Sequence, residues 1–141
     1  MTAVHGVARS WELPEKWLEW HPTCHHKNSL ELFDEFMGEV KPWRTPKLMY
    51  VWGHTFEFDN NNNWEVIEEL LEKATKEEDI WFATNMEIYE YVEAFNDLIF
   101  SADGNTIYNP TRFDFWALVN ANWKPDSGRL VKIPSGEITR V

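Results

Sequence analysis

Apolar residues recur at helical spacing in three parts of the chain, and polar residues fill the positions between them. Ser29, Asn63 and Asn85 stand at the starts of these segments, where a side-chain oxygen can cap a helix, and Gly38 ends the first. The pattern predicts helices over residues 29–37, 63–79 and 85–98.

Two short runs are continuously apolar instead. LMYVW (48–52) and IWFAT (80–84) are typical of strands buried on both faces of a parallel sheet. A further short strand is predicted at 3–9, a short helix or turn at 13–20, and a strand end with a loop at 21–28. Because strands and helices alternate, we expect an α/β fold with helical crossovers between parallel strands.

The pattern changes after residue 98. An Asp-Gly-Asn turn at 103–105 separates two β-type runs, and a Pro-Ser-Gly turn at 134–136 separates two more. We therefore predict two parts: an α/β part over residues 1–98 and a small antiparallel β extension over 99–141.

Charge and composition restrict the function classes. The net charge is −11, most of it between residues 57 and 93, so neither nucleic acid nor an anionic membrane is an expected partner. No apolar stretch approaches the ~20 residues of a membrane span. The N-terminus does not resemble a signal peptide, and a single Cys fits a reducing compartment, so we expect a cytoplasmic protein. Nine Trp suit either an aromatic core or surfaces that stack on sugar rings.

His54 is the first candidate for chemistry. It follows the predicted strand 48–52 at its carboxyl end, where parallel α/β folds place functional groups, and Gly53 permits a tight turn. Glu57 or Asp59 could hydrogen-bond its imidazole and raise its pKa, as suits a general acid. The alternative is a histidine that ends the strand and satisfies a backbone carbonyl.

The sequence HPTCHH (21–26) is the second candidate. His21, Cys24 and His26 form a weak metal-ligand set, because adjacent His25 and His26 would point to opposite faces of an extended strand. Cys24 as a nucleophile would need a lowered pKa and a neighbouring base. Otherwise the group lines a cleft or packs polar atoms against backbone.

Several motifs together carry a family resemblance. They are LPEKWLEWHPTCHH (13–26), VWGHTFEFDNNNNWEVIEEL (51–70), DIWFATNMEIYEYV (79–92) and FSADGNTIYNP (100–110). With VARS (7–10), they make the chain resemble the C-terminal half of polysaccharide deacetylases, the NodB-homology or carbohydrate esterase family 4 group.

The resemblance implies part of a (β/α) barrel and metal-dependent hydrolysis of a C–N (amide) bond in N-acetylated sugars. His54 matches the family's histidine on the last barrel strand, the general acid that protonates the leaving amine. A divalent metal, zinc or similar, is expected to polarise the acetyl carbonyl. The residues expected to line the substrate site are Trp20, His21, Cys24, His25, His26, Trp52 and Glu57.

The chain also departs from the family pattern. Its 141 residues contain neither the TFDDG-like motif, which supplies the base and metal-binding aspartates, nor an H-x-x-x-H metal motif in the family's position. We therefore expect the chain to need a separate N-terminal half, or to form a homo-oligomer, and not to hold the metal alone. The alternatives are a non-catalytic carbohydrate-binding protein, with Trp20, Trp43, Trp52 and Trp64 as stacking surfaces, and a degenerate fragment without a role.

Overall fold

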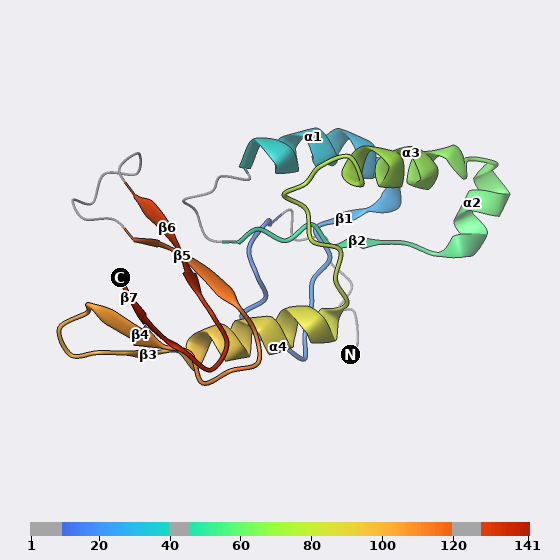
Figure 1. Ribbon diagram of the computed structural model, residues 1–141. Coiled ribbons are helices and arrows are strands. Elements are labelled where there is room, and N and C mark those ends of the chain that lie inside the picture. Colours follow the sequence, from blue (N-terminus) through green and yellow to red (C-terminus); the bar gives the residue numbers. More distant parts are fainter. Residues whose placement is uncertain (1–9, 40–45, 120–127) are drawn as a thin grey trace. The chain divides into compact units, whose positions relative to one another are not determined.

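The computed structural model describes residues 10–39, 46–119 and 128–141. They divide into two compact units, the first ending at Trp81 and the second beginning at Phe82 (Figure 1). The division precedes residue 98, because the helix before that residue packs in the core of the second unit. The strand predicted at 3–9 and the side chain of Trp43 lie outside the described residues.

The first unit begins with a strand, a helix and a second strand. Strand β1 (Cys24–His25) leads through a single 3-10 turn, η1 (His26–Asn28), into helix α1 (Ser29–Glu39). Strand β2 (Val51–Trp52) runs parallel to β1, with Cys24 opposite Val51 and His25 opposite Trp52. This pair is parallel, but it joins β2 to residues 24–25 and not to the strand predicted at 80–84. Within the described ranges the sheets are small, and none closes into a barrel.

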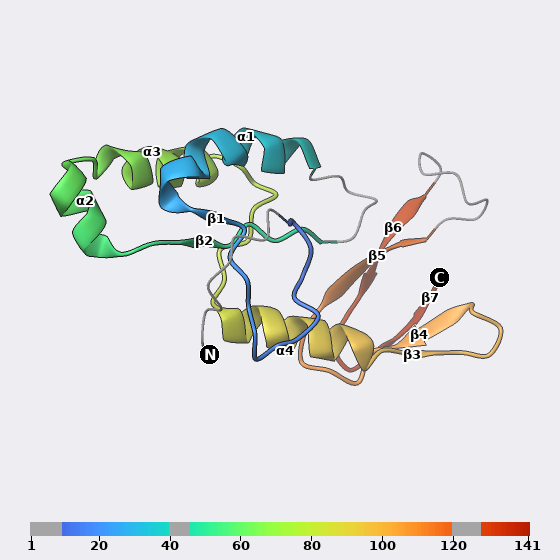
Figure 2. The same ribbon diagram turned by 180° about the vertical axis from the view of Figure 1, so that it is seen from behind.

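Two more helices complete the first unit, α2 (Thr55–Asn61) and α3 (Glu65–Ala74). Helix α2 lies between the strand predicted at 48–52 and the helix predicted from residue 63, where the sequence pattern predicted no helix. Helix α2 ends at Asn62, which has the left-handed φ of 47° that Asn tolerates, and the turn places Trp64 rather than Asn63 at the N-cap of α3. Helices α1 and α3 lie on one side of the strand pair (Figures 1 and 2).

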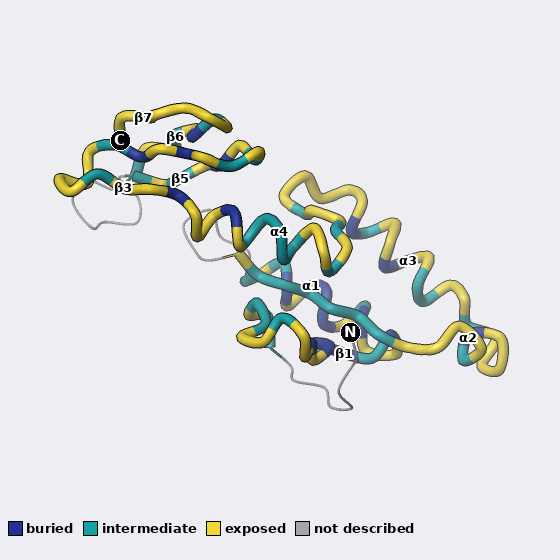
Figure 3. Tube along the Cα trace, turned by 90° about the horizontal axis from the view of Figure 1, so that it is seen from below, coloured by how far each residue is buried: buried dark blue, intermediate teal, exposed yellow. Residues whose placement is uncertain are grey.

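The core of the first unit forms between these two helices. Phe33 of α1 packs against Leu70 and Ala74 of α3, and Val51 of β2 packs against the same cluster. Lys73 and Asp34 form an ion pair across the helices, with Nζ and Oδ1 3.2 Å apart. Figure 3 shows buried positions in α1 and α3, whereas α2 is largely exposed and buries only Phe58.

Residues 80–84 do not form the predicted strand. The segment is irregular, and the side chains of Trp81 and Phe82 are 57% and 54% exposed. An apolar run becomes a buried strand only where a neighbouring strand hydrogen-bonds it, and no described strand pairs with this one. The apolar composition alone was therefore a misleading signal.

The described part of the second unit contains one helix and five short strands. Helix α4 (Asn85–Asn96) precedes β3 (Ile99–Phe100) and β4 (Thr106–Tyr108), which pair as the predicted antiparallel hairpin. β7 (Ile138–Arg140) joins the other edge of β4, while β5 (Phe115–Val119) pairs with β6 (Arg129–Ile133). The hairpin turn contains Gly104, whose φ of 71° is readily adopted only by glycine.

The helix and the sheets of this unit share one core. Phe115 and Ile133 are fully buried, and Ala94 and Leu98 pack with them at the end of α4. This is the physical reason why α4 belongs with the β extension. No helix in the described part of either unit is both long enough and apolar enough to cross a membrane.

Candidate functional site

The carboxyl ends of β1 and β2 bring two of the sequence motifs together. His25 ends β1 opposite Trp52, which ends β2, and their ring centroids lie 5.2 Å apart. His54 follows Trp52 by two residues, with the ring centroids 5.8 Å apart. The parallel pairing therefore gathers the polar groups of HPTCHH and WGH at one edge, as expected for this arrangement.

His25 and His26 lie on the same side of the chain. Their ring centroids are 4.1 Å apart, so the prediction that they face opposite ways is wrong. The alternation of a strand stops at His25, because His26 already belongs to the 3-10 turn η1. His25 also serves as the N-cap of this turn, its Nδ1 accepting a long 3.3 Å hydrogen bond from the Lys27 N–H.

Glu57, in the first turn of α2, faces both histidines. Its Oε2 lies 3.0 Å from Nε2 of His25 and 3.7 Å from Nδ1 of His26. The same oxygen accepts the backbone N–H of His54 at 3.1 Å, which ties the start of α2 to the strand end. This N–H, followed by the contact with His25, lowers the pKa of the Glu57 carboxyl and keeps it ionised.

His26 is enclosed. Its side chain is 2% exposed, its ring packs 4.3 Å from that of Phe58, and neither ring nitrogen has a hydrogen-bond partner among the described residues. Burial, followed by the nearby His25, lowers its pKa, so the ring is the neutral imidazole that metals bind. A Cβ built on Gly53 would lie 2.1 Å from Nδ1 of His26, so only glycine fits beside the ring.

His54 is exposed, and its ring stacks on Phe56 at 5.1 Å between centroids. The prediction that Glu57 or Asp59 would bind its imidazole is wrong. The Glu57 carboxylate binds His25 and the His54 backbone, and Asp59 accepts the indole N–H of Trp64 at 2.9 Å. The imidazole is exposed, and its contact in the capping box of α2 is with the Glu57 backbone N–H.

His21 and Cys24 stand apart from this group. His21 is exposed, and Cys24 is fully buried, where burial raises the pKa of its thiol. A nucleophilic cysteine needs access and a lowered pKa, and Cys24 has neither. The weak metal set His21, Cys24 and His26 is therefore not assembled. Sequence reasoning assigned His25 to the substrate site, and Glu57 to the substrate site or the His54 imidazole, so it missed both as possible metal ligands. Helix α2, which carries Glu57, was not predicted.

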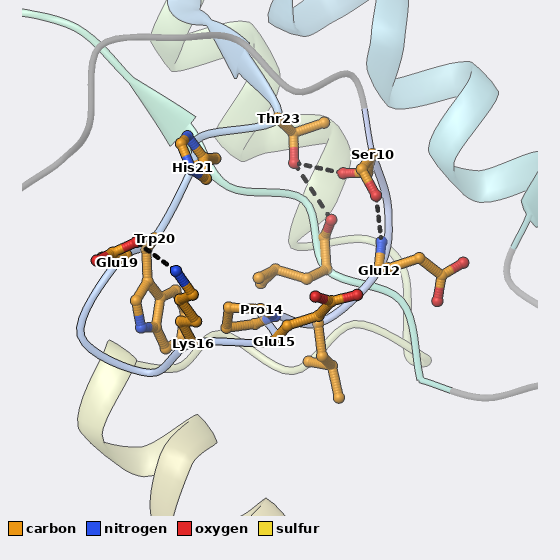
Figure 4. Close-up of a pocket in the computed structure, with 11 residues that line it drawn as sticks. Ser10, Glu12, Pro14, Glu15, Lys16, Glu19, Trp20, His21 and Thr23 are labelled. Atoms are coloured by element: carbon orange, nitrogen blue, oxygen red, sulfur yellow. Dashed lines mark hydrogen bonds and ion pairs between the residues drawn. The ribbon is translucent and has the colours of Figure 1, made fainter.

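Trp20 lines a pocket of about 290 Å³ near the start of the described chain. Figure 4 shows Trp20 beside Lys16, with His21 and Thr23 elsewhere on the rim. The Trp20 ring is 2% exposed, and its indole N–H donates to the Trp17 carbonyl at 2.7 Å. Little of this ring is left for stacking on a sugar.

The metal expected from the resemblance can be compared with these side chains. His25, His26 and Glu57 each offer one ligand atom, and these atoms lie within 4.8 Å of one another. The unpartnered nitrogens of His26 add to the fit. Two imidazoles and a carboxylate are a donor set that zinc accepts, so these residues fit a divalent cation.

Comparison of the chain with protein-family models, with curated proteins and with solved structures found no match. The site geometry therefore carries the functional argument.

Proposed function

We propose that the chain belongs to a polysaccharide deacetylase-like hydrolase, which removes acetyl groups from N-acetylated sugars with His54 as the general acid. The observation that supports the proposal most is the meeting of two motifs at one strand edge. The parallel pair β1–β2 places His54 beside the group formed by His25, His26 and Glu57.

Hydrolysis of the amide forms a bond from a water oxygen to the acetyl carbon and breaks the C–N bond. The amine leaves well only when its nitrogen receives a proton. His54, exposed and stacked on Phe56, is the group placed to donate it, and its backbone is held by Glu57. A divalent metal, when bound, would supply polarisation of the acetyl carbonyl.

A base is also required to take the proton of the attacking water. The family's aspartate motif is not found in these 141 residues, so we assign the base to a separate N-terminal half that pairs with β1 and β2. Strands β1 and β2 have only two residues each and form a sheet of two described strands. The outer edge of each is where a strand of the other half could add. The unpaired, buried Cys24 is in keeping with the proposed cytoplasmic location.

The test is acetate release from N-acetylglucosamine oligomers, with the chain alone and mixed with a deacetylase N-terminal half, each with and without zinc. We expect metal-dependent release from the mixture. His54→Gln should lower the rate by at least about 100-fold, the usual contribution of a general acid. Asn60→Ala, an exposed residue of α2, is the control that should keep the rate.

Two results would count against this proposal. One is no release in any combination, and the other is a rate that His54→Gln leaves unchanged.

Non-catalytic carbohydrate binding is the second candidate, and the exposed His54–Phe56 stack favours it. Such a flat face suits contact with a sugar ring. Under this alternative, Phe56→Ala would weaken binding of N-acetylglucosamine oligomers at least tenfold in calorimetry, while no acetate is released. Release of acetate that depends on His54 would exclude it.

A further inference from the structure

We propose that His25, His26 and Glu57 bind one divalent cation of the zinc type, so that the chain itself carries a metal site. The inference differs from the sequence-based expectation that the metal needs residues of another chain. It concerns binding alone and is tested without a substrate.

The burial of His26 is the first argument. A polar side chain that is 2% exposed normally has a hydrogen-bond partner, because water has been removed from it at a cost. Both ring nitrogens of His26 lack one in the described part of the chain, and Oε2 of Glu57 is too distant from Nδ1, at 3.7 Å. A cation between His26 and Glu57 would provide the missing partner.

The spacing of the ligand atoms is the second argument. Two ligands at about 2.0 Å from a tetrahedral zinc lie roughly 3.3 Å from each other. The Glu57 Oε2 stands 3.0 Å from the His25 nitrogen and 3.7 Å from the His26 nitrogen, on either side of that value. The three side chains therefore need only small shifts to share one ion.

Gly53 supplies the third argument. A Cβ at residue 53 would lie 2.1 Å from Nδ1 of His26, so the ring and a larger side chain cannot both be present. Glycine therefore allows the His26 ring to stand where its Nδ1 faces Glu57.

The accessibility of the group suits an exchangeable ion. The His25 and Glu57 side chains are 18% and 20% exposed, so solvent reaches these two side chains although His26 is buried. Three protein ligands leave one position for water or a substrate, as in catalytic zinc sites. The His54 N–H donates to the Glu57 carboxylate and would orient it as an outer-shell contact.

Metal binding would also change which ring nitrogen of His25 carries the proton. Nδ1 of His25 accepts the Lys27 N–H, which leaves Nε2 as the nitrogen that carries the proton and donates to Glu57. A cation on Nε2 requires the proton to be on Nδ1 instead. The 3.3 Å Lys27 contact would then be given up, and the exposed Lys27 can turn to water.

The experiment is a titration of the purified full chain, stripped with chelator, with cobalt chloride, followed by visible absorption, and with zinc chloride in a calorimeter. We expect one ion per chain and a cobalt spectrum of tetrahedral type. The imidazole nitrogen signals of His25 should report the change of tautomer in NMR. No saturable binding would overturn the proposal.

The variants use the two partly exposed ligands, because His26 is buried and its replacement could prevent folding. His25→Gln and Glu57→Gln should each weaken binding at least tenfold, with an unchanged circular dichroism spectrum. His21→Gln is the matched control and should bind as the parent does, since His21 lies outside the group. Equal loss in all three variants, or loss in His21→Gln alone, would overturn the proposal.

The result is separable from the proposed function. Metal binding without acetate release would support this inference and count against the hydrolase. Acetate release together with no saturable metal binding by the chain would support the hydrolase and overturn this site.

Discussion

At the scale of single residues, the site depends on close contacts that a sequence does not display. Gly53 could be anticipated as a turn residue, but its backbone is not left-handed. What requires glycine there is the His26 ring, which occupies the space that a side chain would need. His26 in turn was assigned to a strand, and its burial follows from the turn that begins at that residue.

Gly53→Ala is expected to destabilise the first unit by about 1–3 kcal/mol, since the buried ring must move or the strand end must shift. Gly38→Ala is the control, because nothing lies within 4 Å of its Cβ position inside α1. Gly38→Ala should raise the free energy of unfolding of the first unit by about 0.5–1 kcal/mol. Urea unfolding followed by near-ultraviolet circular dichroism measures both. A Gly53→Ala variant as stable as the parent would contradict the packing of His26.

At the scale of elements, the motifs behind the family resemblance have local structural roles in the second unit. In the ATNME segment, Thr84 and Glu87 form a capping box at the start of α4. In the SADGN segment, Asp103 organises the β3–β4 turn. These parts of the pattern have a structural role within the second unit.

Thr84→Ala should destabilise α4 by about 1 kcal/mol, because the Glu87 N–H loses its acceptor at 3.3 Å and the Glu87 carboxylate loses the hydroxyl at 2.8 Å. Faster amide hydrogen exchange in the first turn of α4 would show it. Thr84→Ser keeps the oxygen and should restore protection. Loss of protection in both variants alike would mean that the cap is not the cause.

Asp103 gives the second unit a dependence on pH. Hydrogen bonds from the Ser101 hydroxyl and then from the Asn105 N–H lower its pKa to about 2 from the ordinary 3.8. Because the folded-state pKa is depressed, the carboxylate stabilises the fold above about pH 4 and loses that effect as the pH falls towards 2.

Asp103→Asn should therefore lower the midpoint of urea unfolding at pH 7, and the difference from the parent should shrink towards pH 2. Glu137→Gln removes an exposed carboxylate elsewhere in the same unit and serves as the control. If the effect of Asp103→Asn were the same at both pH values, the charge of this turn would not be what stabilises it.

The elements themselves were predictable to different degrees. Helices α1, α3 and α4 and the β3–β4 hairpin carry local signals, namely amphipathic spacing and a Gly turn, and the sequence located them. Helix α2 was missed because its Asn-rich segment has low helix propensity and buries only Phe58. The strand predicted at 80–84 does not form, because strand formation depends on partner strands elsewhere in the chain. The approach of Glu57 to His25 required α2, so that part of the site could not be predicted.

At the scale of the whole molecule, each unit has its own core, and the first is the less complete. Its sheet contains two strands of two residues, and so short a pair is not stable by itself. In its described part, the second unit has a three-stranded sheet with β4 in the middle, and a core in which Phe115 and Ile133 are fully buried. This contrast leads to an expectation about association.

The chain is expected to self-associate, because no other described strand pairs with the outer edges of β1 and β2. Sedimentation velocity across a range of protein concentrations should show species larger than the monomer. Addition of a deacetylase N-terminal half should replace them with a one-to-one complex if the proposed partner occupies the same edges. A monomer at all concentrations would contradict this expectation.

The two units should also respond separately to substitutions that destabilise their cores. Asn109 is fully buried in the second unit, where its amide donates to the Phe113 and Ile133 carbonyls and accepts from Thr111. Asn109→Ala leaves these groups unpaired and should destabilise that unit by about 3 kcal/mol. Phe33→Ala opens a cavity in the core of the first unit and should cost about 3–5 kcal/mol there.

Hydrogen exchange resolved by peptide distinguishes the two responses. Asn109→Ala should speed exchange within residues 82–119 and 128–141 and leave cobalt binding by the first unit unchanged. Phe33→Ala should weaken cobalt binding and leave exchange in β5 and β6 as in the parent, because their core is built from residues of the second unit alone. If either variant accelerated exchange in both units equally, the chain would unfold as one cooperative body, and the metal group would depend on the stability of the whole chain.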